Sequence, residues 1–87
     1  MRVVEIRNIC REAGGIYYLR KFKGTAVIEL HEGDFETPVE FSIETDPLGV
    51  KKIDVILSET INYPVVPIKN ALKTYITAAD TKGKLPL

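Results

Sequence analysis

The stretch that decides the fold is Phe35-Glu36-Thr37-Pro38-Val39-Glu40-Phe41-Ser42-Ile43-Glu44. Apolar side chains at Phe35, Val39, Phe41 and Ile43 alternate with acids and other polar or small residues. A period of two over this length is the pattern of a half-buried β-strand with one apolar and one acidic side. The sequence therefore predicts a strand over residues 35–45.

The dipeptide Gly33-Asp34 precedes this strand and predicts a two-residue hairpin turn, because both residues tolerate positive φ. The turn joins residues 35–45 to a strand over residues 25–32. The register that follows has the pairs Ile28–Val39 and Ala26–Phe41 on one face and His31–Glu36 on the other.

A second turn, Asp46-Pro47-Leu48-Gly49, leads into a strand over residues 50–57. Both registers put the apolar side chains on one face, and a slip of one residue would break this agreement. Pro38 has no N–H to donate, so the pairing is expected to stop near Ser58 or to form a bulge. The pairs across this turn are Ile43–Ile53, Phe41–Val55 and Val39–Leu57, with Glu44–Lys52 on the other face.

Two further strands are expected over residues 2–10 and 16–22, linked by a turn at Gly14-Gly15. Two alternatives stay open for their register. A two-residue turn buries Tyr17 and Leu19 with the core face, whereas a three-residue turn buries Ile16 and Tyr18. Residues 16–32 could also form one long bent strand with a bulge at Gly24.

The last element is a helix over residues 64–81. Asn62 is the expected cap, and Pro64 and Pro67 fit the first turn, where the backbone N–H has no helical partner. Gly83 should end the helix in a left-handed conformation, with Leu85 folding back on the apolar stripe. The stripe itself recurs at three- and four-residue spacing and comprises Val65, Ile68, Leu72, Tyr75, Ile76 and Ala79.

The sequence thus predicts a single domain over residues 1–87. Its class is α+β, with an antiparallel β-meander of four or five strands and one C-terminal helix packed on one face of the sheet. The expected core face of the sheet comprises Ala26, Ile28, Leu30, Val39, Phe41, Ile43, Ile53, Val55 and Leu57.

The formal charge is zero, but it is unevenly distributed: residues 1–23 carry +4, residues 24–48 carry −7 and residues 49–87 carry +3. We interpret these blocks as cross-strand ion pairing, with a basic surface that steers an anionic partner as the alternative. No apolar run is long enough to cross a membrane. The acid Glu5 argues against an export signal, and the single Cys10 excludes an internal disulfide. A cytoplasmic protein is expected.

One helix covers one face of the sheet, so the other face should be polar. Several apolar side chains nevertheless fall on it, and contiguous apolar patches mark contact surfaces. We therefore expect a protein-interaction module, self-associating through this second face or an edge of the sheet as a homodimer, or binding another protein. The interface candidates are Val27, Ile56, Tyr18, Phe22 and Ile16.

An alternative function is single-stranded nucleic-acid binding by residues 17–23. Aromatic side chains stack on unpaired bases while cations hold phosphates. Strands followed by one helix also occur in PUR-type single-strand binders, although none of their diagnostic motifs is legible here. Against this hypothesis, the aromatics could be core residues and the cations could pair with Glu29 and its neighbours. The candidates are Tyr17, Tyr18, Arg20, Lys21, Phe22 and Lys23.

No residue pattern predicts catalysis, a cofactor or a metal site. His31 to Glu36 gathers potential ligands at a hairpin tip, but neighbouring strand residues point to opposite faces, so a solvated turn with a His31–Glu36 pair is expected. Cys10 is expected to be a small buried thiol. No nucleophile and base stand at a telling spacing, so we expect a protein that is not an enzyme.

Overall fold

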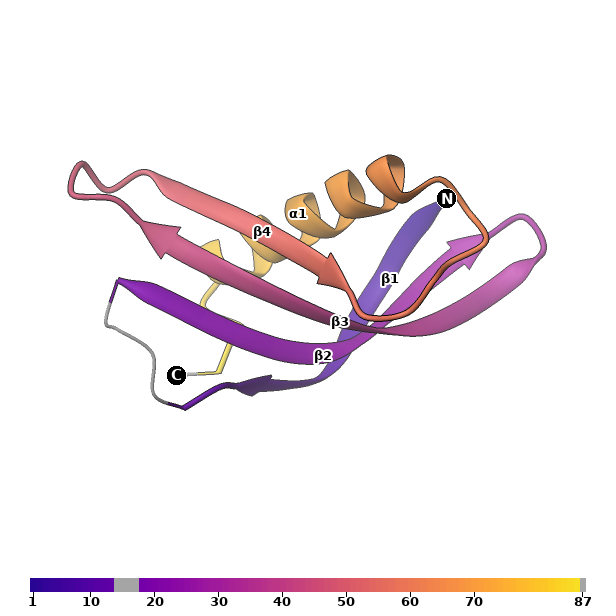
Figure 1. Cartoon of the computed structure of the whole chain (residues 1–87), viewed down its shortest axis with the longest axis horizontal. Coiled ribbons are helices and arrows are strands. Elements are labelled where there is room, and N and C mark those ends of the chain that lie inside the picture. Colours follow the sequence, from indigo (N-terminus) through magenta and orange to yellow (C-terminus); the bar gives the residue numbers. More distant parts are fainter. Residues whose placement is uncertain (14–17, 87) are drawn as a thin grey trace.

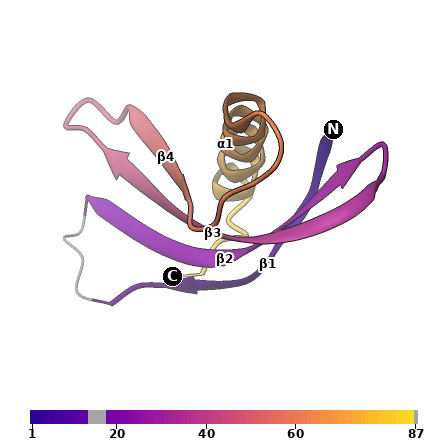
Figure 2. The ribbon, with the colours of Figure 1, turned by 45° about the vertical axis from the view of Figure 1, so that its right-hand side comes forward.

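The computed structural model describes residues 1–13 and 18–86. Its elements are β1 (Arg2–Arg11), β2 (Leu19–Leu30), β3 (Gly33–Thr45), β4 (Lys51–Leu57) and α1 (Val65–Thr81). The strands form one antiparallel sheet in the order β1-β2-β3-β4, a meander (Figure 1). The sheet curves, and α1 lies on its concave side, contacting β1 and β4 (Figure 2). The predicted α+β architecture is confirmed.

The predicted register between β3 and β4 is confirmed at every pair. In the turn, the Asp46 carboxylate accepts from the amides of Leu48 and Val50, and Gly49 takes a φ of 85°. The ladder ends at the pair Val39–Leu57. Pro38 follows, and its lack of an N–H accounts for this end of the pairing.

The predicted register between β2 and β3 is wrong by four residues. The turn residues are His31 and Glu32, and Gly33 closes the hairpin with a φ of 123°. The displacement is even, so the side chains of residues 25–45 keep their predicted faces. The observed pairs are Ile28–Phe35, Ala26–Thr37 and Phe22–Phe41 in place of Ile28–Val39, Ala26–Phe41 and His31–Glu36.

β2 is one strand and not two, so the sheet has four strands. The bulge predicted at Gly24 lies instead on the facing strand, between Arg7 and Cys10, where Asn8 has a φ of 54°. Gly24 itself pairs regularly with Val39. A Cβ at Gly24 would lie 2.9 Å from Ile6 Cγ2 and 3.0 Å from the Arg7 carbonyl oxygen. The glycine therefore lets β1 approach β2 closely at the bulge.

The helix begins one residue later than predicted, after Pro64, and Asn62 is not its cap. Pro67 falls in the first turn, as expected. At the other end Gly83 has a φ of 68°, and the amide of Lys84 donates to the carbonyl of Ala79 at 2.9 Å. This geometry is that of a Schellman cap, and it buries Leu85 against the core.

The core lies between α1 and the concave face of the sheet. Phe22 and Phe41 stack there with ring centroids 5.0 Å apart. The buried residues that form the core are Ile6, Phe22, Ala26, Ile28, Val39, Phe41, Ile43, Val55, Ile68, Leu72, Ile76, Ala79 and Leu85.

Thr37 faces this core and is 3% exposed. Its Oγ1 has no hydrogen-bond partner among the described residues. A buried unsatisfied hydroxyl costs free energy, so Thr37→Val should raise the free energy of unfolding by about 1 kcal/mol. Urea denaturation of the two proteins measures the difference. A loss of stability in Thr37→Val would contradict this assignment.

Candidate interaction edge

The five interface candidates do not form one patch. Phe22 is a correction: it lies on the core face with 0% exposure, and it contributes nothing to the second face, the side of the sheet opposite α1. Val27 does lie on the second face but is 9% exposed, whereas Ile56 there is 58% exposed. Tyr18 is 44% exposed beside the end of β3, where its carbonyl accepts from the Thr45 amide. Ile16 lies outside the described residues.

Val27 is covered by an ion pair. Arg7 on β1 pairs with Thr25, and Glu36 on β3 pairs with Val27, so the Arg7–Glu36 bridge crosses β2 above this position. The predicted contiguous patch in the middle of the second face is therefore replaced by a charged cover. The exposed apolar side chain that remains, Ile56, sits on β4 at the rim of the sheet.

The nucleic-acid candidates are divided by the alternation of β2. Phe22 points into the core, and Arg20 is held by Asp80 of the helix. Lys21 and Lys23 are exposed on the second face, where Lys23 lies 3.6 Å from both Glu12 and Glu40. Tyr17 lies outside the described residues. The described aromatics and cations of residues 18–23 therefore do not share one surface.

Cross-strand ion pairing accounts for the charge blocks. Arg2 pairs with Glu29, Arg7 with Glu36, and Lys23 with Glu40. Each pair joins the basic first block to the acidic second block, as the sequence predicted. The expected pair between His31 and Glu36 is not formed, because His31 is a turn residue and Glu36 bonds Arg7.

Asp80 ties three elements together near the C-terminal end of α1. Both of its carboxylate oxygens accept from Arg20 of β2, at 3.0 and 3.3 Å, and Lys51 of β4 lies 2.5 Å from Oδ2. The hydrogen bond from Arg20 lowers the pKa of Asp80 from 3.8, assisted by Lys51, while burial opposes the shift. A carboxylate at a helix C-terminus is unfavourable on its own, and these cations offset that cost.

This network predicts a pH dependence of stability. Because the folded-state pKa of Asp80 is depressed, its contribution is fully present above the unfolded-state pKa and is lost as the pH falls through the folded-state pKa. Asp80→Asn should lower the free energy of unfolding by about 1–2 kcal/mol at neutral pH. The gap between the two proteins should close in acid. Urea titrations at neutral and acidic pH measure it, and a gap independent of pH would contradict the assignment.

The two edges of the sheet differ. β1 carries register shifts between Val3 and Glu5 and between Arg7 and Cys10. Bulges of this kind twist an edge and hinder pairing with another chain. β4 pairs with β3 without any shift over Lys51–Leu57. It therefore presents the regular open edge of the sheet.

The backbone groups that β4 turns outward follow from one hydrogen bond. The Asp46 amide donates to the Val50 carbonyl at 2.9 Å, so these two residues form a hydrogen-bonded pair. Such pairs recur at every second residue of an antiparallel ladder. Lys52, Asp54 and Ile56 therefore bond β3. The residues with outward amides and carbonyls are Lys51, Ile53, Val55 and Leu57.

Two exposed apolar side chains frame this edge on the second face. Val50 is 61% exposed and Ile56 is 58% exposed, with Lys52 and Asp54 between them. We refer to the outward backbone of Lys51–Leu57 together with these four side chains as the β4 edge. Sequence reasoning found Ile56 but missed Val50, although the alternation of residues 50–57 places it on the same face.

Several residues with reactive or ligating side chains lie apart from this edge. Cys10 is exposed, contrary to the buried thiol that was expected. No three His, Cys, Asp or Glu side chains gather to hold a metal ion within residues 1–13 and 18–86. Over the same residues, no helix is long and apolar enough to cross a membrane.

The architecture defines the class of the protein: a small α+β domain with an antiparallel four-stranded meander, a C-terminal helix and one open sheet edge. The chain belongs to the BB_0187 family, whose model matches residues 1–81. No curated protein and no solved structure matches the chain. Family membership assigns no activity by itself, so the function is argued from the surfaces of the molecule.

Proposed function

We propose that the domain is a non-catalytic protein-interaction module that binds an extended protein strand along the β4 edge. In this mode, called β-augmentation, backbone hydrogen bonds provide affinity and alternate side chains provide specificity. A cytoplasmic location is part of the proposal and is supported by the single, exposed Cys10, since a reducing compartment keeps such a thiol free.

The observation that carries the proposal is the contrast between the two edges. Natural sheets protect their edges with bulges, charges or covering segments. β1 has two register shifts, while β4 is regular and flanked by Val50 and Ile56, both more than half exposed. A strand added to β4 would find four residues with outward backbone groups and cover both side chains.

Electrostatics supports a binding role over proton chemistry. Asp80 is held as a carboxylate between Arg20 and Lys51, and its lowered pKa is the reverse of what a general acid needs. Its hydrogen bonds join β2, β4 and α1, so the group stabilises the frame that carries the β4 edge.

The alternative function, single-stranded nucleic-acid binding through residues 17–23, is less well supported. It needs stacking aromatics beside accessible cations. Phe22 is fully buried, and Arg20 and Lys23 lie close to acids of the same chain. No described surface gathers the groups that the alternative requires.

The test is selection from a displayed library of extended eight-residue peptides, with the protein held at low micromolar concentration. Selected peptides should lose binding to Ile56→Lys and should shift the amide resonances of Ile53 and Val55. The matched control is Lys21→Glu, an exposed change on the same face away from β4, which should leave binding intact.

Two results would contradict the proposal. One is a library that yields no peptide whose binding depends on Ile56. The other is salt-sensitive binding of mixed single-stranded oligonucleotides that is abolished by Tyr18→Ala or Arg20→Glu, which would support the alternative function instead.

A further inference from the structure

We infer that the strand bound by the β4 edge is β4 of a second copy of this chain, paired antiparallel about a twofold axis at Ile53. This inference rests on the proposed function, because it names the partner of the same edge. An isologous contact uses the same surface patch on both copies, so the β4 edge must be complementary to itself.

Few registers need to be compared. A twofold axis normal to the sheet keeps the faces aligned, so each residue must meet one on its own face. The residue on the axis then meets its own copy. The candidates for this central position within β4 are therefore Lys52, Ile53, Asp54 and Val55.

Charge removes two of these registers. An axis at Lys52 sets that lysine against itself, and an axis at Asp54 sets two carboxylates face to face. Like charges directly opposite one another destabilise a strand pair. An axis at Val55 sets Asp54 against Ile56, which joins a carboxylate to an apolar side chain and satisfies neither.

The axis at Ile53 satisfies both kinds of side chain. Lys52 then faces Asp54 of the second copy, and the symmetry repeats this ion pair. Val50 faces Ile56 of the second copy, so each of the two exposed apolar side chains covers the other. The outward backbone groups fit as well, because Ile53 meets its copy and Lys51 meets Val55.

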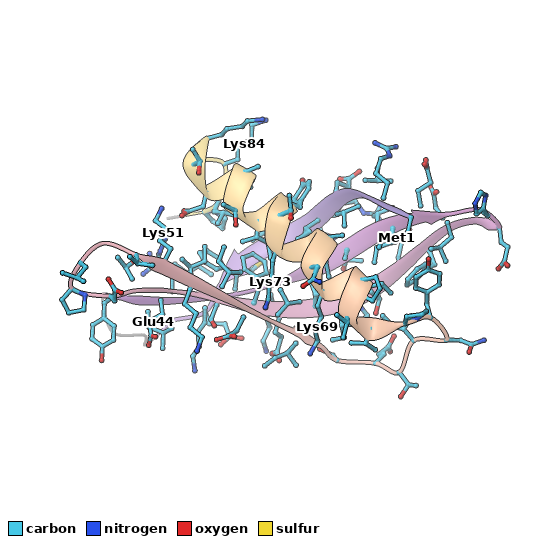
Figure 3. The ribbon with its side chains drawn as sticks, turned by 90° about the horizontal axis from the view of Figure 1, so that it is seen from above. Met1, Glu44, Lys51, Lys69, Lys73 and Lys84 are labelled. Atoms are coloured by element: carbon cyan, nitrogen blue, oxygen red, sulfur yellow. The ribbon has the colours of Figure 1, made fainter. Side chains whose placement is uncertain are left out.

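The seam between the two β4 strands also carries a cost. Lys69 and Lys73 extend from α1 on the side of the helix above β4 (Figure 3), so both copies bring cations toward the seam. The contact is one strand wide, far smaller than a stable obligate interface. The dimer is therefore expected to be weak, forming at tens to hundreds of micromolar.

Disulfide trapping tests the register in the full-length chain. All variants carry Cys10→Ser, which removes the single native thiol. A mixture of Val50→Cys and Ile56→Cys chains should form a mixed disulfide faster than either chain forms a homodimer, since directly opposite strand residues lie within disulfide reach. Both positions are exposed, so these variants are expected to fold.

Sedimentation equilibrium of the unmodified chain supplies the second measurement. Lys52→Asp and Asp54→Lys should each associate with themselves about tenfold more weakly, because two attractive pairs become repulsive. A mixture of the two variants should associate again, since each meets the opposite charge. The control mixture pairs Lys21→Cys with Ile56→Cys, which should not crosslink faster than random collision.

The outcomes separate the inference from the proposed function. A chain that stays monomeric at hundreds of micromolar, with no excess mixed disulfide, overturns the second copy as partner; edge-dependent peptide binding would still stand. A dimer trapped by Asp54→Cys with itself, and not by the mixture, overturns the register at Ile53. Fast mixed disulfide formation with restored association of the charge variants establishes the inference.

Discussion

Replacing Phe22 by alanine is expected to lower the free energy of unfolding by about 3–5 kcal/mol, the range for truncating a buried aromatic side chain. Phe22 has 0% exposure, and its ring stacks on Phe41 with centroids 5.0 Å apart. The truncation loses both the buried apolar area and the aromatic contact and leaves a cavity beneath α1. Guanidinium denaturation measures the effect as a lower midpoint at an unchanged m-value.

Two control variants make this result specific. Phe22→Leu keeps most of the volume and should cost much less than Phe22→Ala. Tyr18→Ala removes an aromatic side chain that is 44% exposed, four residues earlier, and should also cost much less. Equal losses for Phe22→Ala and Tyr18→Ala would mean that Phe22 is not in the core, and the observed register of β2 would then be wrong.

Replacing Gly24 by alanine is expected to cost about 1–3 kcal/mol, the range for overpacking a close contact. The new Cβ would lie 2.9 Å from Ile6 Cγ2 and 3.0 Å from the Arg7 carbonyl oxygen. A side chain could turn away, but the backbone carbonyl cannot move without opening the β1–β2 ladder. Thermal or denaturant unfolding of the purified variant measures the loss.

A double-mutant cycle separates this clash from a general loss of stability. In an Ile6→Ala background the Cγ2 contact is gone, so adding Gly24→Ala should cost less than it does in the parent chain. Strictly additive losses would contradict a steric contact between these two residues. Thr25→Ala, one position along and half-buried on the other face, is the matched control and should have a small effect.

The part of the fold that could be predicted is the part with local signals. The alternation of residues 35–45 and the turn at Asp46–Gly49 together predicted every pair between β3 and β4. The hairpin before it was misplaced because Gly33 was taken as a turn residue, when it is the positive-φ residue that follows the turn. Glycine marks a turn region but does not by itself say which of its positions it fills.

The candidate site was predicted in part for a related reason. Ile56 was identified because its face follows directly from the β3–β4 register. Phe22 was misassigned because the face of β2 depended on a turn length that the sequence left open. Val27 was assigned to the correct face but not recognised as covered, because its cover is an ion pair between residues of two other strands, Arg7 and Glu36.

Periodicity, turn residues and helix stops in the sequence alone determined that this chain forms an antiparallel meander followed by one amphipathic helix. They did so because these signals act between near neighbours in the chain. Only the tertiary structure decided that Phe22 belongs to the core, that β1 is bulged against Gly24 and that β4 is left as the open edge. These features depend on contacts between distant segments, where packing and ion pairing select among registers that local propensity leaves nearly equal in free energy.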